Sequence, residues 1–148
     1  MSRIWSPHEV LPHRPPMQLI TRIVAWGSQE LVAEVDIADD GPFAEPGLGV
    51  PRWVGLEYMA QAVAALDGIR LREAGRGVPP GYLLGTRRLE QTDGYFQPGA
   101  TLRITVQEVL QGENGLGIFS CLLEPGERSL SCQLTVYRPA QNSPDSND

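Results

Sequence analysis

The sequence has few residues that support metal or disulfide chemistry. Of its 148 residues only two are cysteine, Cys121 and Cys132, and two are histidine. Two thiols do not complete the ligand set of a structural zinc site, so we expect no metal and no other cofactor. If residues 124–128 form a tight hairpin centred on Gly126 and Glu127, the cysteines face each other across it, and a reducing cytoplasm would leave them as thiols.

The sequence also lacks an excess of positive charge and a leader-like apolar run. Its formal net charge is −6, which argues against a nucleic-acid or anionic-membrane partner, because such contacts are built from clustered basic residues. The proline-rich N-terminus contains no signal-like apolar segment, so we expect a cytoplasmic protein. No internal repeat is present. We expect one domain over residues 1–140 and a disordered polar tail over residues 141–148.

One segment, residues 51–71, is apolar around the whole helical circumference, which is typical of a helix buried on most sides. It is long enough to cross a bilayer, but Arg52, Glu57 and Asp67 interrupt it, and each charge at mid-membrane costs roughly 2.5–3.5 kcal/mol. We therefore predict that it is the central helix of a soluble core, beginning at Pro51, which suits a first helical turn.

Glu57 and Gln61 stand four residues apart in this helix and so share one face, among apolar neighbours. Burial there would keep part of Glu57 protonated near neutral pH, as a proton-transferring group requires. The alternative is that Glu57 forms an ion pair with Arg14 or Arg52 and merely orients the helix.

The flanking segments predict a sheet. Residues 1–18 contain four prolines, so we expect an extended lead-in without regular helix. β-branched and alternating patterns predict a hairpin over residues 19–37 with its turn at Gly27 and Ser28, then a loop over residues 38–50. Beyond the helix, which Gly75 or Gly77 can end, strands are expected over residues 82–92, 101–107, 117–123 and 130–137. The fold class is α+β, an antiparallel sheet wrapped round one long helix.

This order of elements, with its motifs, resembles the hot-dog fold of the 3-hydroxyacyl-carrier-protein dehydratases over about residues 11–139. The matching motifs are Leu11-Pro12-His13-Arg14 with Pro16, the helix signature Pro51 followed by Leu56-Glu57-Tyr58-Met59-Ala60-Gln61, and the turn Phe96-Gln97-Pro98-Gly99. The resemblance implies a hot-dog domain that forms a dimer through a sheet edge, with active sites at the interface.

One position departs from that family. Its dehydratases carry a histidine eight residues before the proline that starts the helix, and here Phe43 stands in that place. The sequence is more similar to the divergent dehydratase-like proteins of aryl polyene gene clusters, which share the lead-in motif and a tryptophan after the helix proline, here Trp53. In the family the histidine removes the proton beside the thioester carbonyl, and a glutamate on the partner's helix protonates the leaving hydroxyl. Only the glutamate, Glu57, is matched.

These considerations give a set of candidate site residues. Glu57 is the expected acid, and His13 is the one histidine in a matched motif, so it either takes part in catalysis or ties the lead-in to the sheet. Asp40 and Glu45 lie near the lost histidine and are alternative bases or simply solvated loop residues. Backbone amides at the helix start can hold a thioester oxygen. The expected substrate-binding residues are Gln61, Trp53, Val54, Gly55, Phe43 and Gly85.

The expected function is dehydration of 3-hydroxyacyl thioesters in fatty-acid or polyene-type chain assembly. The alternatives are a hot-dog acyl thioesterase and a non-catalytic subunit that binds acyl carrier protein or completes another hot-dog subunit. The expected partners are an acyl carrier protein or coenzyme A thioester and a second hot-dog subunit, in a homodimer or a heterodimer. Arginines near the helix end and after Gly85 could form a local positive rim for such a carrier: Arg70, Arg72, Arg76, Arg87 and Arg88.

Overall fold

Alternating strands and one apolar helix build the architecture that the sequence predicts. The computed structural model describes residues 3–76, 82–87, 89–90, 92–112, 114–124 and 128–137, so the predicted polar tail and the predicted turn at Gly126 and Glu127 lie outside the described residues. The elements in chain order are α1 (Pro7–Val10), β1 (Arg22–Trp26), β2 (Glu30–Asp36), β3 (Val50–Pro51), a 3-10 turn (Arg52–Val54), α2 (Gly55–Glu73), β4 (Tyr82–Arg87), β5 (Tyr95–Phe96), β6 (Thr101–Gln111), β7 (Leu116–Glu124) and β8 (Leu130–Tyr137).

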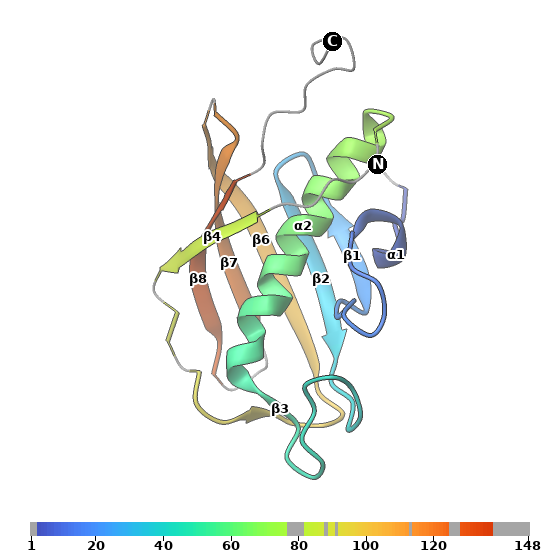
Figure 1. The fold of residues 1–148 in the computed structure, drawn as a ribbon, viewed down its shortest axis with the longest axis vertical. Coiled ribbons are helices and arrows are strands. Elements are labelled where there is room, and N and C mark those ends of the chain that lie inside the picture. Colours follow the sequence, from blue (N-terminus) through green and yellow to red (C-terminus); the bar gives the residue numbers. More distant parts are fainter. Residues whose placement is uncertain are drawn as a thin grey trace.

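The main sheet has six strands in the order β1-β2-β6-β7-β8-β4, and every neighbouring pair is antiparallel. The sheet curves round α2, which lies across its concave face over β2, β6 and β7 (Figure 1). The predicted α+β arrangement is confirmed. The sheet ends at β1 on one side and at β4 on the other, so β4 presents an edge that antiparallel pairing with another chain could extend.

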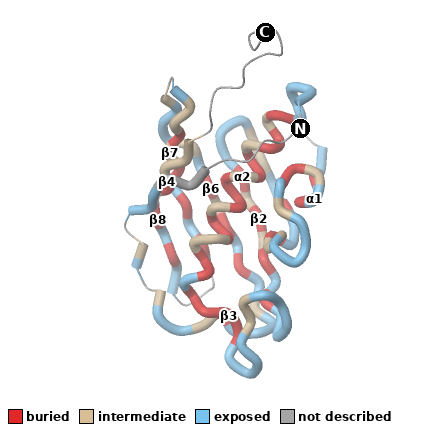
Figure 2. Tube along the Cα trace, viewed as in Figure 1, coloured by how far each residue is buried: buried red, intermediate tan, exposed pale blue. Residues whose placement is uncertain are grey.

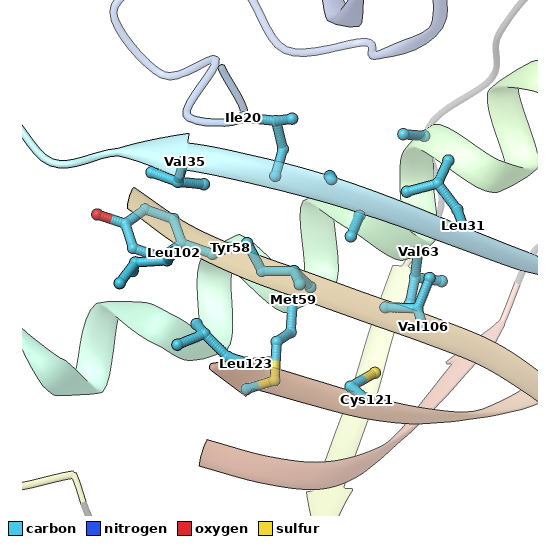
Figure 3. Close-up of a cluster of buried hydrophobic side chains, with 14 of the residues drawn as sticks. Ile20, Leu31, Val35, Tyr58, Met59, Val63, Leu102, Val106, Cys121 and Leu123 are labelled. Carbon is cyan, nitrogen blue, oxygen red and sulfur yellow. The ribbon is translucent and has the colours of Figure 1, made fainter. Parts of the chain in front are cut away.

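Inward-facing residues of the strands form the core against α2. In β6 the buried residues alternate with exposed or half-buried ones, as Leu102, Ile104 and Val106 do in the sequence. Figure 3 shows Leu102 and Val106 on the side of β6 that faces Met59 and Val63 of the helix, and Ile104 belongs to the same buried cluster. The period of two in the strands therefore places one apolar face against the helix.

Cys121 and Cys132 lie directly opposite each other in the β7–β8 pair, as predicted, and both are buried free thiols. Contact with Cys132, together with burial, raises the pKa of the Cys121 thiol, so it stays protonated. Cys132 also contacts the sulfur of Met59 at 3.9 Å. The pair is thus part of the apolar core under α2.

The helix is buried on most sides, as its composition predicts, and Figure 2 shows the buried residues running along its length. Its start differs slightly from the prediction. Pro51 belongs to the short strand β3 and pairs with Tyr95, a 3-10 turn follows, and the α-helix begins at Gly55. The end is as predicted, because Gly75 has φ +75 and the amide of Arg76 donates to the carbonyl of Leu71 in a left-handed cap.

The lead-in contains a feature that the sequence interpretation missed. Residues 7–10 form the one-turn helix α1 despite the prolines, because Ser6 and Glu9 make a capping box and Pro7 occupies the first helical position, where its missing N–H costs nothing. The carbonyl of Val10 packs on Gly68 of α2, where a Cβ would stand only 2.0 Å from that oxygen. The motif Ser-x-x-Glu, with a proline directly after the serine, is the feature of the sequence that indicates this helix.

The chain between β4 and β6 also departs from the prediction. The strand expected over residues 82–92 ends at Arg87, and a separate short strand, β5, pairs with β3 below the helix start. Gly49 makes this close approach possible, since it has φ +104 and a Cβ there would collide with the carbonyl of Phe96 at 2.0 Å. The loop over residues 38–50 is otherwise as expected.

Candidate functional site

A cavity of about 460 Å³ lies along one face of α2. The lead-in, α2, β6, β7 and β8 all contribute to its walls, and small helix residues leave the space open. Its lining residues are Pro12, His13, Glu57, Ala60, Gln61, Val63, Ala64, Asp67, Arg70, Glu108, Gln111, Gly115, Leu116, Gly117, Phe119 and Val136. A volume of this size is typical of a small-molecule site.

Glu57 stands at the end of the cavity nearest the start of α2. Its side chain is 41% exposed in the single chain, so it is less buried than the apolar sequence around it suggests. The reason is that its helix face looks into the cavity rather than onto the sheet. Its partners among the described residues are Gln61, whose Nε2 donates to Oε2 at 3.2 Å, and His13.

Gln61 is the most constrained side chain of the site and is only 1% exposed. Its Oε1 accepts from the amide of Leu19 at 2.9 Å, and its Nε2 donates to the carbonyl of Met17 at 2.8 Å. These two bonds fix the orientation of the amide, so the remaining N–H of Nε2 faces Glu57. Through this N–H, Gln61 contacts the Glu57 carboxylate.

His13 is brought to Glu57 by the lead-in. Its Nε2 lies 3.8 Å from Oε2 of Glu57, too far for a direct hydrogen bond and close enough for an ion pair when the imidazole is protonated. The side chain is 30% exposed, and its buried Nδ1 has no hydrogen-bond partner among the described residues. A substrate atom could therefore bridge the imidazole and the carboxylate.

The structure shows Arg14 and Arg52, the two arginines considered as ion-pair partners of Glu57, in contact with other groups. The guanidinium of Arg14 donates to the carbonyls of Leu11 and His13, which bends the lead-in back on itself. Arg52 is buried, lies 5.1 Å from the ring of Phe96, and donates to the carbonyl of Arg128. Both arginines thus organise the backbone on either side of the site, and Glu57 remains turned toward the cavity.

The residues predicted at the helix start lie outside this cavity. Trp53 is 58% exposed and contacts Phe43 edge to face, and Val54 is buried in the core. The amide of Gly55 donates to the carbonyl of Arg52, so it is not the free donor that we expected, because the 3-10 turn uses it. Gly55 is instead a packing position, where a Cβ would stand 2.6 Å from Leu130 Cδ1.

The other predicted loop and strand positions are also separate from Glu57. Phe43 and Asp40 line a second, smaller cavity of about 140 Å³ between the lead-in and the loop over residues 38–50. Glu45 accepts a hydrogen bond from the hydroxyl of Tyr95 at 2.8 Å, which fixes the loop. Gly85 is exposed on the edge strand β4, beside a register shift. The cavity at Glu57 is built instead from the lead-in, α2, β6, β7 and β8.

The far end of the cavity contains polar residues that the sequence interpretation did not assign to the site. Arg70 donates to Oε1 of Glu108 at 2.9 Å and to the carbonyl of Ser28 at 2.7 Å, and Gln111 lies nearby on β6. The helical period could have indicated this end of the cavity. Glu57, Gln61, Ala64, Asp67 and Arg70 follow each other at three- and four-residue steps, which places them on one helix face.

The expected positive rim is only partly available to a carrier. Arg70 is engaged as described, and Arg72 donates to the carbonyl of Glu9, which fastens α1 to the end of α2. Arg88 lies outside the described residues. Within the described ranges, no group of three metal-ligating side chains occurs and no helix is long and apolar enough to span a membrane.

The curved sheet round a helix that carries Glu57 at a cavity defines a hot-dog protein with an acid on its central helix. The model of the ApeP-like family, described as ApeP dehydratase, matches residues 5–146. The chain therefore belongs to the ApeP-like family of dehydratases, and the dehydratase-like resemblance seen in the sequence is confirmed. No curated protein matches the chain significantly.

Solved structures agree with this assignment. A chain of the dehydratase heterocomplex ApeI:P from Xenorhabdus doucetiae superposes with a TM-score of 0.82 at 27% identity, covering 94% of each chain. A putative thioesterase from Ralstonia eutropha, a phenylacetic acid degradation-related protein, gives a TM-score of 0.58 at 15% identity and covers 78% of this chain and 83% of that one. A hypothetical thioesterase with coenzyme A from Streptococcus pneumoniae gives 0.59 at 13% identity, with 82% and 88% covered. The last two show the shared fold.

Proposed function

We propose that this protein dehydrates 3-hydroxyacyl thioesters in polyene-type chain assembly, with Glu57 as the group that protonates the leaving hydroxyl. The observation that carries the proposal is the placement of Glu57 at the cavity, held by Gln61 and facing His13. Membership of a dehydratase family supports the reaction class. We also infer that the acyl group is delivered by an acyl carrier protein.

In this reaction a base removes the proton on the carbon next to the thioester carbonyl, while the carboxyl of Glu57 protonates the 3-hydroxyl, which leaves as water. The electron pair of the broken C–H bond becomes the new double bond. We assign the base to the imidazole of His13, since Phe43 stands where the family has its histidine. After release, the protonated imidazole and the Glu57 carboxylate face each other at 3.8 Å, close enough to exchange the proton that resets the site through a water.

A second hot-dog subunit completes the proposed site. The edge strand β4, the exposed Trp53 and the 41% exposed Glu57 lie on surfaces that the single chain leaves uncovered. The solved relative from Xenorhabdus doucetiae is itself part of a heterocomplex. We therefore propose a dimer with another hot-dog chain, joined along β4, which shields the cavity from water and strengthens electrostatic interactions within it.

The decisive experiment is incubation with a 3-hydroxyacyl-carrier-protein, with and without a co-expressed hot-dog partner, followed by mass detection of the acyl group. We expect the loss of one water. Release of free thiol would instead indicate a thioesterase, and no product with or without the partner would leave only a carrier-binding role. Either result would overturn the proposal.

The variant His13→Gln tests the choice of base. Loss of activity comparable to that of Glu57→Gln, with an unchanged melting temperature, would support His13 as the base. If His13→Gln keeps most of the activity, the base comes from the partner subunit and His13 serves to hold the lead-in against α2. Sedimentation at micromolar concentration tests the dimer, and a monomer in the presence of the partner would contradict it.

A further inference from the structure

We propose that Cys121 and Cys132 form a site of reversible oxidation, at which hydrogen peroxide converts the two thiols into a disulfide that links β7 to β8. Both thiols are free and buried in the structure. The dehydration proposed above uses neither of them, so this inference does not depend on the proposed function. It assigns a chemical role to a pair of side chains that otherwise only fills the core.

The register of the two strands places the cysteines where a disulfide can form. Cys121 and Cys132 stand directly opposite each other in the antiparallel β7–β8 pair, and both occupy buried positions on its inner face. The Cα atoms of opposite residues in an antiparallel pair are about 4.5 or 5.5 Å apart. Disulfides join Cα atoms that are about 4.4–6.8 Å apart, so this pair can be linked without a change of strand register.

The surroundings make the two thiols chemically unequal. A hydrogen bond from Cys121 lowers the pKa of the Cys132 thiol to about 7, against the effect of burial. Contact with Cys132 and burial both raise the pKa of the Cys121 thiol. Because the thiolate is the nucleophilic form, Cys132 is the residue that attacks an oxidant, and Cys121 is the residue that closes the disulfide.

The pair lies behind the wall of the cavity along α2. Phe119, two residues before Cys121 on the same face of β7, lines that cavity. Val63, one helical turn after Met59, lines it as well, and the sulfur of Met59 contacts that of Cys132 at 3.9 Å. A molecule little larger than water can reach the thiols from the cavity by local side-chain motion, whereas a bulky disulfide is excluded.

The oxidation proceeds in two balanced steps. The Cys132 thiolate attacks one peroxide oxygen and the O–O bond breaks, which leaves a sulfenic acid on Cys132 and a hydroxide that takes up a proton to become water. The Cys121 thiol then attacks this sulfur, the S–O bond breaks, and the hydroxyl group leaves with the Cys121 proton as a second water. The two thiols lose two hydrogen atoms, and a small thiol restores them by exchange.

The test is a mass measurement on the folded full chain after treatment with hydrogen peroxide. We expect the loss of two hydrogen atoms and a melting temperature roughly 5–10 °C higher, because the link closes the chain between the strands. Dithiothreitol should reverse both changes. Trypsin cleaves after Arg128, between the cysteines, so their peptides should be joined before reduction and separate after it. No mass loss, or a link between two chains, would overturn the inference.

Two serine variants separate the roles of the thiols. Cys121→Ser keeps a hydrogen-bond donor beside Cys132 but cannot close the disulfide, so a sulfenic acid should persist on Cys132 and be trapped by dimedone. In Cys132→Ser, burial keeps the Cys121 thiol protonated, and peroxide should oxidise it at least about 10-fold more slowly than the wild-type pair. Equal rates in the two variants would contradict the assignment of the attacking residue.

Met59→Leu is the control for the neighbouring sulfur, and the disulfide should form in this variant as in the wild type. Oxidation of Met59 to the sulfoxide in place of disulfide formation would overturn the inference, because the thioether would then be the target of the peroxide. If a serine variant does not fold, brief oxidation of the wild type in the presence of dimedone gives the same information. The label must appear on Cys132, and a label on Cys121 would contradict the assignment.

Discussion

Two long faces of α2 differ in their role: one packs into the core, and the other lines the cavity. The face toward the sheet carries Met59, Ala62, Leu66 and Ile69, all fully buried in an apolar core. The face toward the cavity carries Glu57, Gln61, Ala64 and Asp67, where polar groups alternate with a small residue. The comparison shows that a helix can be apolar nearly all round and still reserve one stripe for chemistry, provided that small side chains keep that stripe from closing.

The strongest test of this difference is Glu57→Gln on the cavity face. The change keeps the side-chain volume and a hydrogen bond to Gln61 but removes the transferable proton, so turnover should fall by roughly 10²–10⁴. The melting temperature should stay the same, because the side chain is 41% exposed and lines the cavity. Steady-state assays and thermal unfolding measure the two quantities.

The matched control for this prediction is Glu73→Gln, an exposed carboxylate in the last turn of the same helix. It should leave both quantities unchanged. Full dehydratase activity in Glu57→Gln would refute the catalytic assignment, and failure of that variant to fold would make Glu57 a structural residue.

The sheet face should respond in the opposite way. Leu66 is fully buried, so Leu66→Ala should cost about 2–5 kcal/mol of unfolding free energy through lost burial and the cavity left behind. On the cavity face, Ala64→Leu adds volume where space exists, so it should cost less than about 1.5 kcal/mol while blocking the substrate. Urea unfolding and substrate titration measure both changes. If Ala64→Leu unfolds the protein, the cavity is not open beside that residue.

Gln61 lines the cavity and is also buried, although its side chain is polar. Its replacement should therefore lower the stability of the fold, although the side chain carries no charge. Gln61→Met keeps the length of the side chain but leaves the Leu19 amide and the Met17 carbonyl without their partners, which should cost about 2–4 kcal/mol. Gln18→Met is the control, because the buried Oε1 of Gln18 has no partner among the described residues. Similar losses in the two variants would show that the measured cost is packing rather than hydrogen bonding.

Much of this arrangement could be predicted from the sequence, for local reasons. The strand alternation, the all-round apolar helix and the Gly75 cap depend on neighbours in the chain, and the structure confirms them. Approaches between distant segments could not be predicted in the same way. The meeting of His13 with Glu57, the Arg70–Glu108 pair and the pairing of β3 with β5 depend on how the lead-in and β6 are placed against α2. The bond from the Gly55 amide to the Arg52 carbonyl could not be predicted either, because the sequence does not distinguish a 3-10 turn from a first α-turn.

The smallest effect is expected for charges that face solvent rather than the cavity. On the outer side of the sheet Arg22 pairs with Glu34 and Asp36, and Arg103 also contacts Glu34. Hydrogen bonds from Arg22 are the main cause that lowers the pKa of both carboxyl groups. The folded pKa values of Glu34 and Asp36 lie below their unfolded values of about 4.3 and 3.9. These carboxylates therefore stabilise the fold fully above the unfolded values, and this stabilisation is lost as the pH falls through the folded values.

Arg22→Gln should therefore lower the melting temperature slightly at neutral pH and make it less sensitive to acid below about pH 4. Thermal unfolding between neutral pH and pH 3, at low and high salt, measures the effect, and salt should reduce it because the charges are exposed. Activity per folded molecule should not change, since the network lies on the opposite side of the sheet from α2. A loss of activity larger than the loss of stability would mean that the outer charge network influences the cavity. The two sides of the sheet would then not be functionally separate.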